Sequence, residues 1–309
     1  MIRIEHLTKS FETHKKPIVA LNDLSLTIPS GSVFGLIGSN GAGKSTLLRL
    51  LAGVYKPDKG SVLLDGAPIY DNPCAKEQIF FIPDDFYYMQ GASLDKMAKL
   101  YRSFYKTFDT HRYQELKKQL DLDGKTSLSS LSKGTRRRAV IALGLAAMPR
   151  ILLLDETFDG LDPVMRNLVK KVIYNDVAER GVTAIITSHS LRELEDTCDR
   201  LALLHSGGIV LESDIENLQT MLLKVQVAFS EEYDISRFEG INILDFNKKG
   251  SVANMIVRGD REEVQHKIFA MCPLLCEILP LTLEEVFIYE LEAKGYAFDE
   301  LLIGSDDVM

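Results

Sequence analysis

The first two thirds of the chain alternate short apolar runs with segments in which apolar residues recur at helical spacing. Val33–Ile37 and Ile151–Leu154 are unbroken apolar runs too short for a helix, and residues 184–186 and 201–204 repeat the pattern. Such runs are typical of strands buried on both faces of a parallel sheet. Helical segments lie between them, and one spans about residues 92–122. The pattern therefore predicts an α/β domain with a mainly parallel sheet.

The pattern changes near residue 215. Apolar residues alternate with polar or small ones from Val225 to Phe229, and strand-like runs at 241–246 and 251–258 flank Asn247–Gly250, which predicts a hairpin turn. A helix near Val264, a short strand at 278–279 and a last helix follow. Thr282 and Glu285 have the spacing of a capping box before that last helix. We therefore expect one domain over residues 1–214 and a small α+β domain over residues 215–309.

The length of the chain agrees with this division into two domains, and other features of the sequence indicate the cellular compartment. A chain of 309 residues suggests two domains. The net charge is −8, and residues 281–309 hold eight acids against Lys294, a net charge of −7, which we interpret as a solvated acidic tail on a nearly neutral chain. No apolar run reaches the roughly 20 residues of a membrane span, and the N-terminus lacks the apolar core of a secretory signal. With four scattered cysteines interpreted as reduced thiols, these features favour the cytoplasm.

A phosphate-binding loop follows the first buried strand. Residues 38–45 match the pattern G-x-x-x-x-G-K-[ST], between a predicted strand and a predicted helix. Glycines let successive backbone N–H groups turn toward phosphate oxygens, and the helix N-terminus adds partial positive charge. We expect Lys44 to bridge the β- and γ-phosphates and the Ser45 hydroxyl to be placed for Mg²⁺. The residues assigned to the nucleotide are Gly38, Ser39, Asn40, Gly41, Ala42, Gly43, Lys44, Ser45 and Thr46.

Two adjacent acids complete the predicted phosphate chemistry. Asp155 ends the buried strand 151–155, so it emerges at the carboxyl edge of the sheet, where nucleotides bind in open α/β folds. Glu156 follows immediately. We interpret Asp155 as the holder of the Mg²⁺ shell and Glu156 as the residue that polarises the attacking water.

Taken in order, these motifs resemble those of the ATP-binding cassette (ABC) ATPases, specifically the nucleotide-binding subunit of an ABC transporter, over residues 1 to about 212. Leu131–Thr135 is similar to the family signature, and Gly160–Pro163 matches its D-loop, with Asp162 in it. His189, 34 residues after Asp155, resembles the switch histidine. Phe11 lies where the family places an aromatic residue on the adenine ring.

The resemblance implies a fold and an assembly. The fold is a P-loop cassette with a mainly parallel sheet, an antiparallel β subdomain and a helical subdomain, followed here by the small α+β domain. Ser132 and Gly134 lie where a helix begins, and in the family that surface meets the γ-phosphate held by a second subunit. The resemblance therefore implies a head-to-tail dimer, here expected to be a homodimer, that encloses two ATP and Mg²⁺ and separates after hydrolysis.

Three positions depart from the family pattern. Lys133 and Thr135 replace the usual glycine and glutamine of the signature. Asp84 stands where the loop after Ile82-Pro83 normally supplies a glutamine that touches Mg²⁺ and the water. An ionised carboxylate accepts hydrogen bonds but cannot donate them. We hypothesise that Asp84 takes the place of that glutamine, at the metal and in catalysis, and that turnover is slower or tuned by a partner.

Two further clusters have competing interpretations. Arg136, Arg137 and Arg138 could suggest nucleic acid, but a helix packed within the domain is the stronger interpretation, so no nucleic-acid partner is expected. Phe86–Met89 is an aromatic cluster in the region where family members receive the coupling helix of a membrane subunit. Core packing of the helical subdomain explains this cluster equally well.

The resemblance thus implies an ATP-hydrolysing subunit that drives a separately encoded transmembrane permease from the inner face of the cell membrane. The order of cassette and C-terminal extension resembles bacterial exporter subunits, so export is the expected direction. The alternatives are a soluble cassette ATPase acting on DNA or the ribosome and a slow-turnover, ATP-dependent regulatory module. The first normally has two cassettes or a long inserted coiled coil, and neither is present in 309 residues. Glu156 argues against the second, while Asp84 and Thr135 leave it open. We expect residues 215–309 to stabilise the dimer or to gate the transporter.

Overall fold

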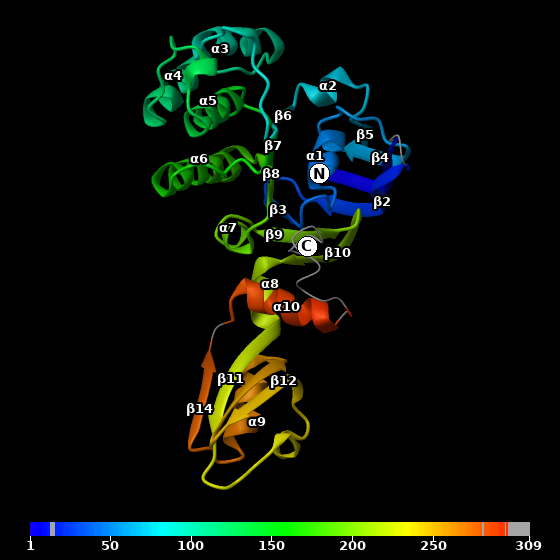
Figure 1. The fold of residues 1–309 in the computed structure, drawn as a ribbon, viewed down its shortest axis with the longest axis vertical. Coiled ribbons are helices and arrows are strands. Elements are labelled where there is room, and N and C mark those ends of the chain that lie inside the picture. Colours follow the sequence, from blue (N-terminus) through cyan, green and yellow to red (C-terminus); the bar gives the residue numbers. More distant parts are fainter. Residues whose placement is uncertain (13–15, 280, 294, 296–309) are drawn as a thin grey trace. The chain divides into compact units, whose positions relative to one another are not determined.

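The computed structural model describes residues 1–12, 16–279, 281–293 and 295, drawn in Figure 1. It divides into two compact units, Met1–Glu212 and Ser213–Met309. This division lies two residues before the boundary expected from the pattern of the sequence. Each unit has its own apolar core.

The first unit is built on a six-stranded sheet with the strand order β10-β9-β3-β8-β7-β6. Strands β9, β3, β8, β7 and β6 pair in parallel, which confirms the predicted sheet. Every residue of β3, β7 and β8 is buried, which explains their unbroken apolar runs. The strands are β3 (Val33–Ile37), β6 (Ile79–Ile82), β7 (Ile151–Asp155), β8 (Thr183–Ser188), β9 (Arg200–His205) and β10 (Gly208–Asp214).

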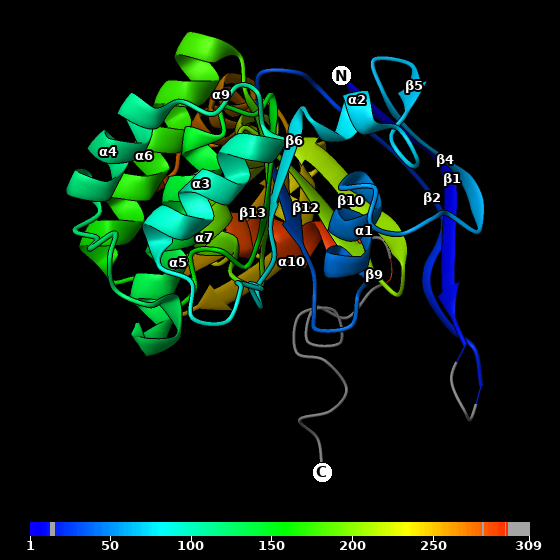
Figure 2. The same cartoon turned by 90° about the horizontal axis from the view of Figure 1, so that it is seen from above.

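Helices cover both faces of this sheet. Figures 1 and 2 show α1 (Lys44–Leu51) on one face, and α5 (Lys133–Ala146), α6 (Pro163–Arg180) and α7 (Leu191–Glu195) on the other. On the α1 side lies an antiparallel sheet with the order β2-β1-β4-β5, which shares one apolar core with α1. Its elements are β1 (Ile2–Phe11), β2 (Ile18–Ile28), β4 (Lys59–Leu64) and β5 (Ala67–Pro68), and α2 (Pro73–Lys76) follows them.

The predicted helical subdomain is present, but its first helical segment is divided. The segment expected over about 92–122 forms α3 (Leu94–Phe104) and α4 (Thr110–Gln119). Asp109 begins the second helix, because its carboxylate accepts a hydrogen bond from the Arg112 amide at 3.0 Å. A short 3₁₀ turn at Leu128–Ser130 precedes α5. Within the described part of the chain, no helix combines the length and the apolar character that a membrane span requires.

The second unit contains an antiparallel sheet with the order β12-β13-β11-β14. The predicted hairpin is confirmed, but its turn lies at Gly250 and Ser251, and residues 247–249 belong to β12. Pairing continues to Lys249 and Val252, and Gly250 adopts φ +63°, which suits a two-residue turn. The elements are α8 (Ile215–Met221), β11 (Leu222–Ala228), a 3₁₀ turn (Ile235–Phe238), β12 (Asn242–Lys249), β13 (Val252–Arg258), α9 (Arg261–Phe269), β14 (Leu275–Leu279) and α10 (Leu283–Ala293).

The acidic segment at the end of the chain is only partly a tail. The capping box is confirmed, since the Thr282 amide donates to Glu285 Oε2 at 2.9 Å and the Glu285 amide donates to Thr282 Oγ1 at 3.2 Å. The interpretation of residues 281–309 as a solvated tail is wrong for α10. Glu290 is buried there and pairs with Arg258 at 2.6 Å. The remaining acids of the segment after α10, Asp299, Glu300, Asp306 and Asp307, lie outside the described residues.

Glu285 should make the stability of the second unit depend on pH. Its hydrogen bond from Lys224 and those from Thr282 hold the pKa of Glu285 below its usual range. A lowered pKa stabilises the fold above the unfolded value of about 4.3, and this stabilisation is lost as the pH falls through the folded value. The side chain is 34% exposed, so screening limits the effect to about 0.5 kcal/mol.

We therefore expect Glu285→Gln to lower the free energy of unfolding near pH 7 by about this amount, with a difference that shrinks toward pH 4. Urea unfolding at several pH values measures it, and Glu284→Gln, an exposed neighbour, is the matched control. Equal losses for the two variants would contradict the assignment.

Candidate active site

The loop between β3 and α1 has the form of a phosphate cradle. It spans residues 38–43, and α1 begins at Lys44. Gly43 adopts φ +109°, and a Cβ there would lie 2.5 Å from the Ala20 carbonyl oxygen, so the position requires glycine. The N–H groups in the first turn of a helix have no partners within the helix and can bind an anion.

Lys44 is held inside this loop. Its side chain is 5% exposed, and Nζ donates to the carbonyl oxygens of Gly38 at 2.5 Å and Ser39 at 3.1 Å. Nζ also lies 3.8 Å from Glu156 Oε1. Burial lowers the pKa of Lys44, and the nearby Glu156 and Asp155 carboxylates oppose that shift. The ammonium group is therefore poised where the loop can enclose phosphate.

The carboxyl ends of β7 and β8 and the start of α1 bring an acid and two hydroxyl groups together. Ser45 Oγ donates to Asp155 Oδ1 at 3.1 Å, and Thr187 Oγ1 donates to the same oxygen at 2.8 Å. Asp155 is 1% exposed and lies opposite Thr187 in the parallel register. Hydroxyl and carboxylate oxygens are hard ligands of the kind that Mg²⁺ accepts beside phosphate oxygens. The donor set of Ser45 and Asp155 therefore fits Mg²⁺.

Glu156 lies at the centre of the side chains expected to act on ATP. Its carboxylate is 3.8 Å from Lys44 Nζ and 4.0 Å from His189 Nδ1. Its backbone adopts φ +46°, its N–H donates to Thr187 Oγ1 at 3.0 Å, and its carbonyl oxygen accepts from Arg137 Nη1. The fold thus brings together Lys44 from the start of α1, Glu156 from the loop after β7 and His189 from the loop after β8.

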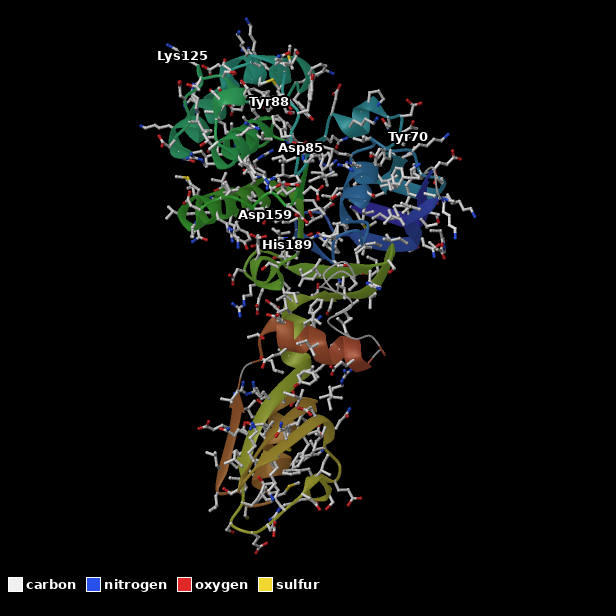
Figure 3. The ribbon with its side chains drawn as sticks, in the orientation of Figure 1. Tyr70, Asp85, Tyr88, Lys125, Asp159 and His189 are labelled. Carbon is white, nitrogen blue, oxygen red and sulfur yellow. The ribbon has the colours of Figure 1, made fainter. Side chains whose placement is uncertain are left out.

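His189 also lies beside a second acid of the loop after β7. His189 Nδ1 is 3.9 Å from Asp159 Oδ2, and Figure 3 shows the two side chains next to each other. His189 is half exposed, with 58% of its side chain accessible. It is therefore reachable by a ligand bound over the loop.

The Asp84 carboxylate already has a hydrogen-bond partner, the guanidinium group of Arg137. Its Oδ1 accepts a hydrogen bond from Arg137 Nη2 at 2.5 Å, and its backbone carbonyl accepts another from the same nitrogen at 2.8 Å. Any role of Asp84 at Mg²⁺ therefore has to operate while the carboxylate is bonded to Arg137, or has to exchange that partner.

The aromatic residue expected at the adenine is at the end of β1. The Phe11 ring is partly exposed and packs edge-to-face on Tyr55, with 5.3 Å between ring centroids. Lys9 Nζ lies 5.5 Å from the Phe11 centroid. This ring can offer a face to a planar base.

The signature segment and the D-loop meet within this chain. Ser132 caps α5, since its Oγ accepts a hydrogen bond from the Thr135 amide at 3.2 Å. A Cβ on Gly134 would lie 2.7 Å from the Gly160 carbonyl oxygen, so this contact requires glycine. Asp162 caps α6 in turn, accepting from the Val164 and Met165 amides at 3.1 and 3.0 Å. Ser132, Gly134 and Asp162 therefore belong to one neighbourhood around the starts of α5 and α6.

Two residues of the site were missed in the sequence. Thr187 carried a usable signal, because it is the second-to-last residue of β8, the strand next to β7, and precedes His189 by two residues. No signal in the sequence distinguished Arg137 from Arg136 and Arg138, since all three belong to one basic triplet. Only the packing of α5 shows that Arg137 is the buried member, with 5% of its side chain exposed.

Comparison with known proteins agrees with this geometry. The family model described as ABC transporter matches residues 21–159. The chain is 31% identical to the ABC transporter ATP-binding protein YtrB of Bacillus subtilis, over 95% of this chain and 99% of the relative. It is 30% identical to the lipopolysaccharide export system ATP-binding protein LptB of Haemophilus influenzae, over 76% of this chain and 99% of the relative. Matches also include methionine import proteins.

Solved structures agree on the fold. A dimeric structure of the ATP-binding cassette MJ0796 in a post-hydrolysis state, bound to ADP and phosphate, superposes with a TM-score of 0.64 at 23% identity. It covers 70% of this chain and 99% of the other. Phosphate loop, sheet topology and relatives of nearly the full length all agree, and the chain belongs to the ABC transporter family, as an ATP-binding subunit with ATPase chemistry.

Proposed function

We propose that this chain hydrolyses ATP in a head-to-tail pair of cassettes and thereby drives a separately encoded transmembrane permease. The observation that carries the proposal is the cluster of Lys44, Glu156 and His189, with Ser45 beside Asp155. Lys44 and Ser45 begin α1, Asp155 ends β7, and Glu156 and His189 follow β7 and β8. All five therefore lie at the carboxyl edge of a parallel sheet, where nucleotides bind in open α/β folds.

ATP would bind along the loop before α1. The backbone N–H groups and Lys44 would hold the phosphates, and the Phe11 ring would pack on the adenine. Ser45 and Asp155 would hold Mg²⁺, which when bound neutralises charge on the β- and γ-phosphates. Burial of Lys44 strengthens its interaction with phosphate, because water competes less there.

Hydrolysis would centre on Glu156. Its carboxylate would accept a proton from the attacking water as the oxygen forms its bond to the γ-phosphorus, and the bond to the β-phosphate oxygen would break to yield ADP and phosphate. His189, 4.0 Å from Glu156, would hydrogen-bond the γ-phosphate or the water. Asp84 would act in the place of the family's glutamine, either while its carboxylate stays bonded to Arg137 or after it exchanges that partner.

A second cassette would complete each site. Ser132 and Gly134 lie at the N-terminus of a 14-residue helix, where a hydroxyl, backbone N–H groups and the helix dipole favour an anion. Asp162 lies in the adjoining loop. We infer that this face meets the γ-phosphate of the other protomer, in a homodimer.

An exposed aromatic cluster supports docking of a membrane subunit. Tyr87 is 83% exposed and Met89 is 51% exposed, which disfavours core packing of this segment. Phe86 and Tyr88 stack at 6.3 Å, and Arg136 lies over the Tyr88 ring. A pocket lined by Asp84, Phe86 and Arg136, among others, adjoins the cluster. Exposed aromatic residues of this kind are frequent anchors of protein interfaces.

We expect Tyr87→Ala to weaken association with the membrane subunit by about tenfold, as loss of an aromatic anchor does, while basal ATP turnover stays unchanged. The test is co-purification and ATPase stimulation with a candidate transmembrane subunit from the same organism. Tyr70→Ala is the matched control, because Tyr70 is also exposed and lies on the other side of the sheet (Figure 3). Normal stimulation of Tyr87→Ala, or an equal loss in both variants, would exclude this face.

Export is the direction that we propose, from the order of a cassette followed by an α+β extension. One relative is named for lipopolysaccharide export and others for methionine import. Vesicles reconstituted with the transmembrane subunit test the direction. With ATP on the cassette side, an exporter moves cargo away from that side and an importer moves cargo toward it. The chain would work at the inner face of the cell membrane.

The second unit would stabilise the dimer or gate transport. If dimerisation and transport are unchanged after deletion of this unit, the proposed role of the unit is wrong.

A slow-turnover regulatory module is the second candidate. Asp84 and Thr135 leave it open, because both stand where the family pattern has glutamine. Steady-state ATP hydrolysis decides between the two functions. A rate no higher than that of a Glu156→Gln variant would favour the regulatory module.

A further inference from the structure

Arg137 joins two loops of the site through one buried side chain. Its Nη1 donates to the backbone carbonyl oxygens of Glu156 and Asp159, the second at 3.1 Å. Its Nη2 donates to the backbone carbonyl of Asp84 at 2.8 Å and to the Asp84 carboxylate at 2.5 Å. The loops after β6 and β7 are therefore linked through a guanidinium group supplied by α5.

The backbone of Glu156 needs such support. A residue other than glycine at φ +46° is in the left-handed region, which costs roughly 1–2 kcal/mol. Both sides of the residue are held, because Thr187 Oγ1 accepts from its N–H at 3.0 Å and Arg137 donates to its carbonyl oxygen. This conformation turns the carboxylate toward Lys44 and His189.

We propose that Arg137 is a positioning residue: it holds the Glu156 backbone in the conformation that aims the carboxylate at the reaction site, and Asp84 holds Arg137. This inference rests on the proposed role of Glu156 in hydrolysis. It also gives Asp84 a way of acting on catalysis through Arg137.

The neighbouring arginines show that this role is particular to position 137. Arg136 donates to the carbonyl oxygens of Leu128 and Leu131, and Arg138 donates to the Leu120 carbonyl oxygen, all within the helical subdomain. A guanidinium carries five N–H donors in a planar fork and can serve several carbonyl oxygens and a carboxylate at once, whereas an ammonium is a point charge. Lysine at position 137 would therefore keep the charge but lose the geometry.

The experiment compares Arg137→Gln and Arg137→Lys in the full chain. We expect both variants to lower kcat for ATP by about tenfold with KM for ATP unchanged, because misplaced groups cost rate and leave binding intact. Hydrogen exchange of the amides at 156–160 should become about tenfold faster, since a loop that opens more often exchanges faster. The lysine variant, which retains the charge beside Asp84, should lose less Tm than the glutamine variant.

Arg112→Gln is the matched control. Arg112 also forms a guanidinium–carboxylate pair, with the buried Asp176, and it lies in α4 with Arg180 as a second partner of Asp176. We expect this variant to lower Tm with kcat and the exchange of residues 156–160 unchanged. The same result for Arg137→Gln, a lower Tm with wild-type kcat or with unchanged exchange of residues 156–160, would overturn the proposal.

Two further variants separate this inference from the proposed function. Wild-type turnover of Glu156→Gln would remove the role of Glu156 itself, whatever the exchange data show. If Glu156→Gln is inactive and Arg137→Gln is fully active, only the positioning role fails. Asp84→Asn should lower kcat in the wild-type chain and add nothing to Arg137→Gln, because coupled residues are not additive. Additive effects would place the action of Asp84 elsewhere than on Arg137.

Discussion

Replacing Glu156 with glutamine is expected to lower kcat for ATP hydrolysis by about 10²–10⁴-fold, the usual contribution of a positioned general base. The amide has nearly the same shape as the carboxylate but cannot accept the proton of the attacking water. ATP should still bind, because the contacts of the loop before α1 with phosphate remain. Steady-state release of phosphate measures the rate, and titration with a fluorescent nucleotide measures the affinity.

The same variant should trap the paired state. If ATP is enclosed between two cassettes and hydrolysis separates them, Glu156→Gln with ATP should elute with the mass of a dimer in light scattering, and with ADP as a monomer. Glu179→Gln, an exposed glutamate of α6, is the control and should turn over ATP at the wild-type rate. A monomeric Glu156→Gln variant with bound ATP would contradict the head-to-tail arrangement.

Replacing Lys44 with methionine is expected to weaken ATP binding by about 10–100-fold, the equivalent of one charge-assisted hydrogen bond of 1.5–3 kcal/mol. The ammonium is buried in the loop, where it would meet the β- and γ-phosphates with little competition from water. Methionine fills a similar length without donating. Isothermal titration with ATP measures the loss.

The fold should survive this substitution, which makes the result interpretable. Removing a buried ammonium also removes its desolvation cost, so we expect Tm to stay within a few degrees of the wild type. Lys125→Met is the control, because Lys125 is exposed in the helical subdomain, away from the loop before α1 (Figure 3). If both variants bind ATP equally well, the phosphate-binding role of Lys44 is wrong.

Local patterns in the sequence were sufficient for most of the first unit. Unbroken apolar runs predicted β3, β7, β8 and β9, because strands covered on both faces leave no solvent-facing positions for polar residues. The loop before α1 was predictable because its glycines, lysine and serine are adjacent in the chain. The capping box at Thr282 was predictable for the same reason, since its two partners are three residues apart.

Boundaries within elements were less predictable. The helical pattern over 92–122 continues through the break between Phe104 and Thr110. The spacing of apolar residues does not show that one helix ends there and that Asp109 caps the start of the next. The hairpin turn moved to Gly250 and Ser251, since the pairing of β12 with β13 extends to the last residue before the glycine.

Contacts between distant segments came from the three-dimensional packing alone. Asp84 and Arg137 are 53 residues apart, and Thr187 meets Asp155 across 32 residues. Glu290 is buried against Arg258, although the charge pattern of residues 281–309 predicted a solvated tail. Residue types and short spacings thus determine the chemistry that the chain carries, because a motif is a local property. Which charged groups pair with each other depends on how helices and strands pack. A guanidinium group and a carboxylate pair only when the fold brings them to the right distance and orientation, and no local pattern in the sequence contains that information.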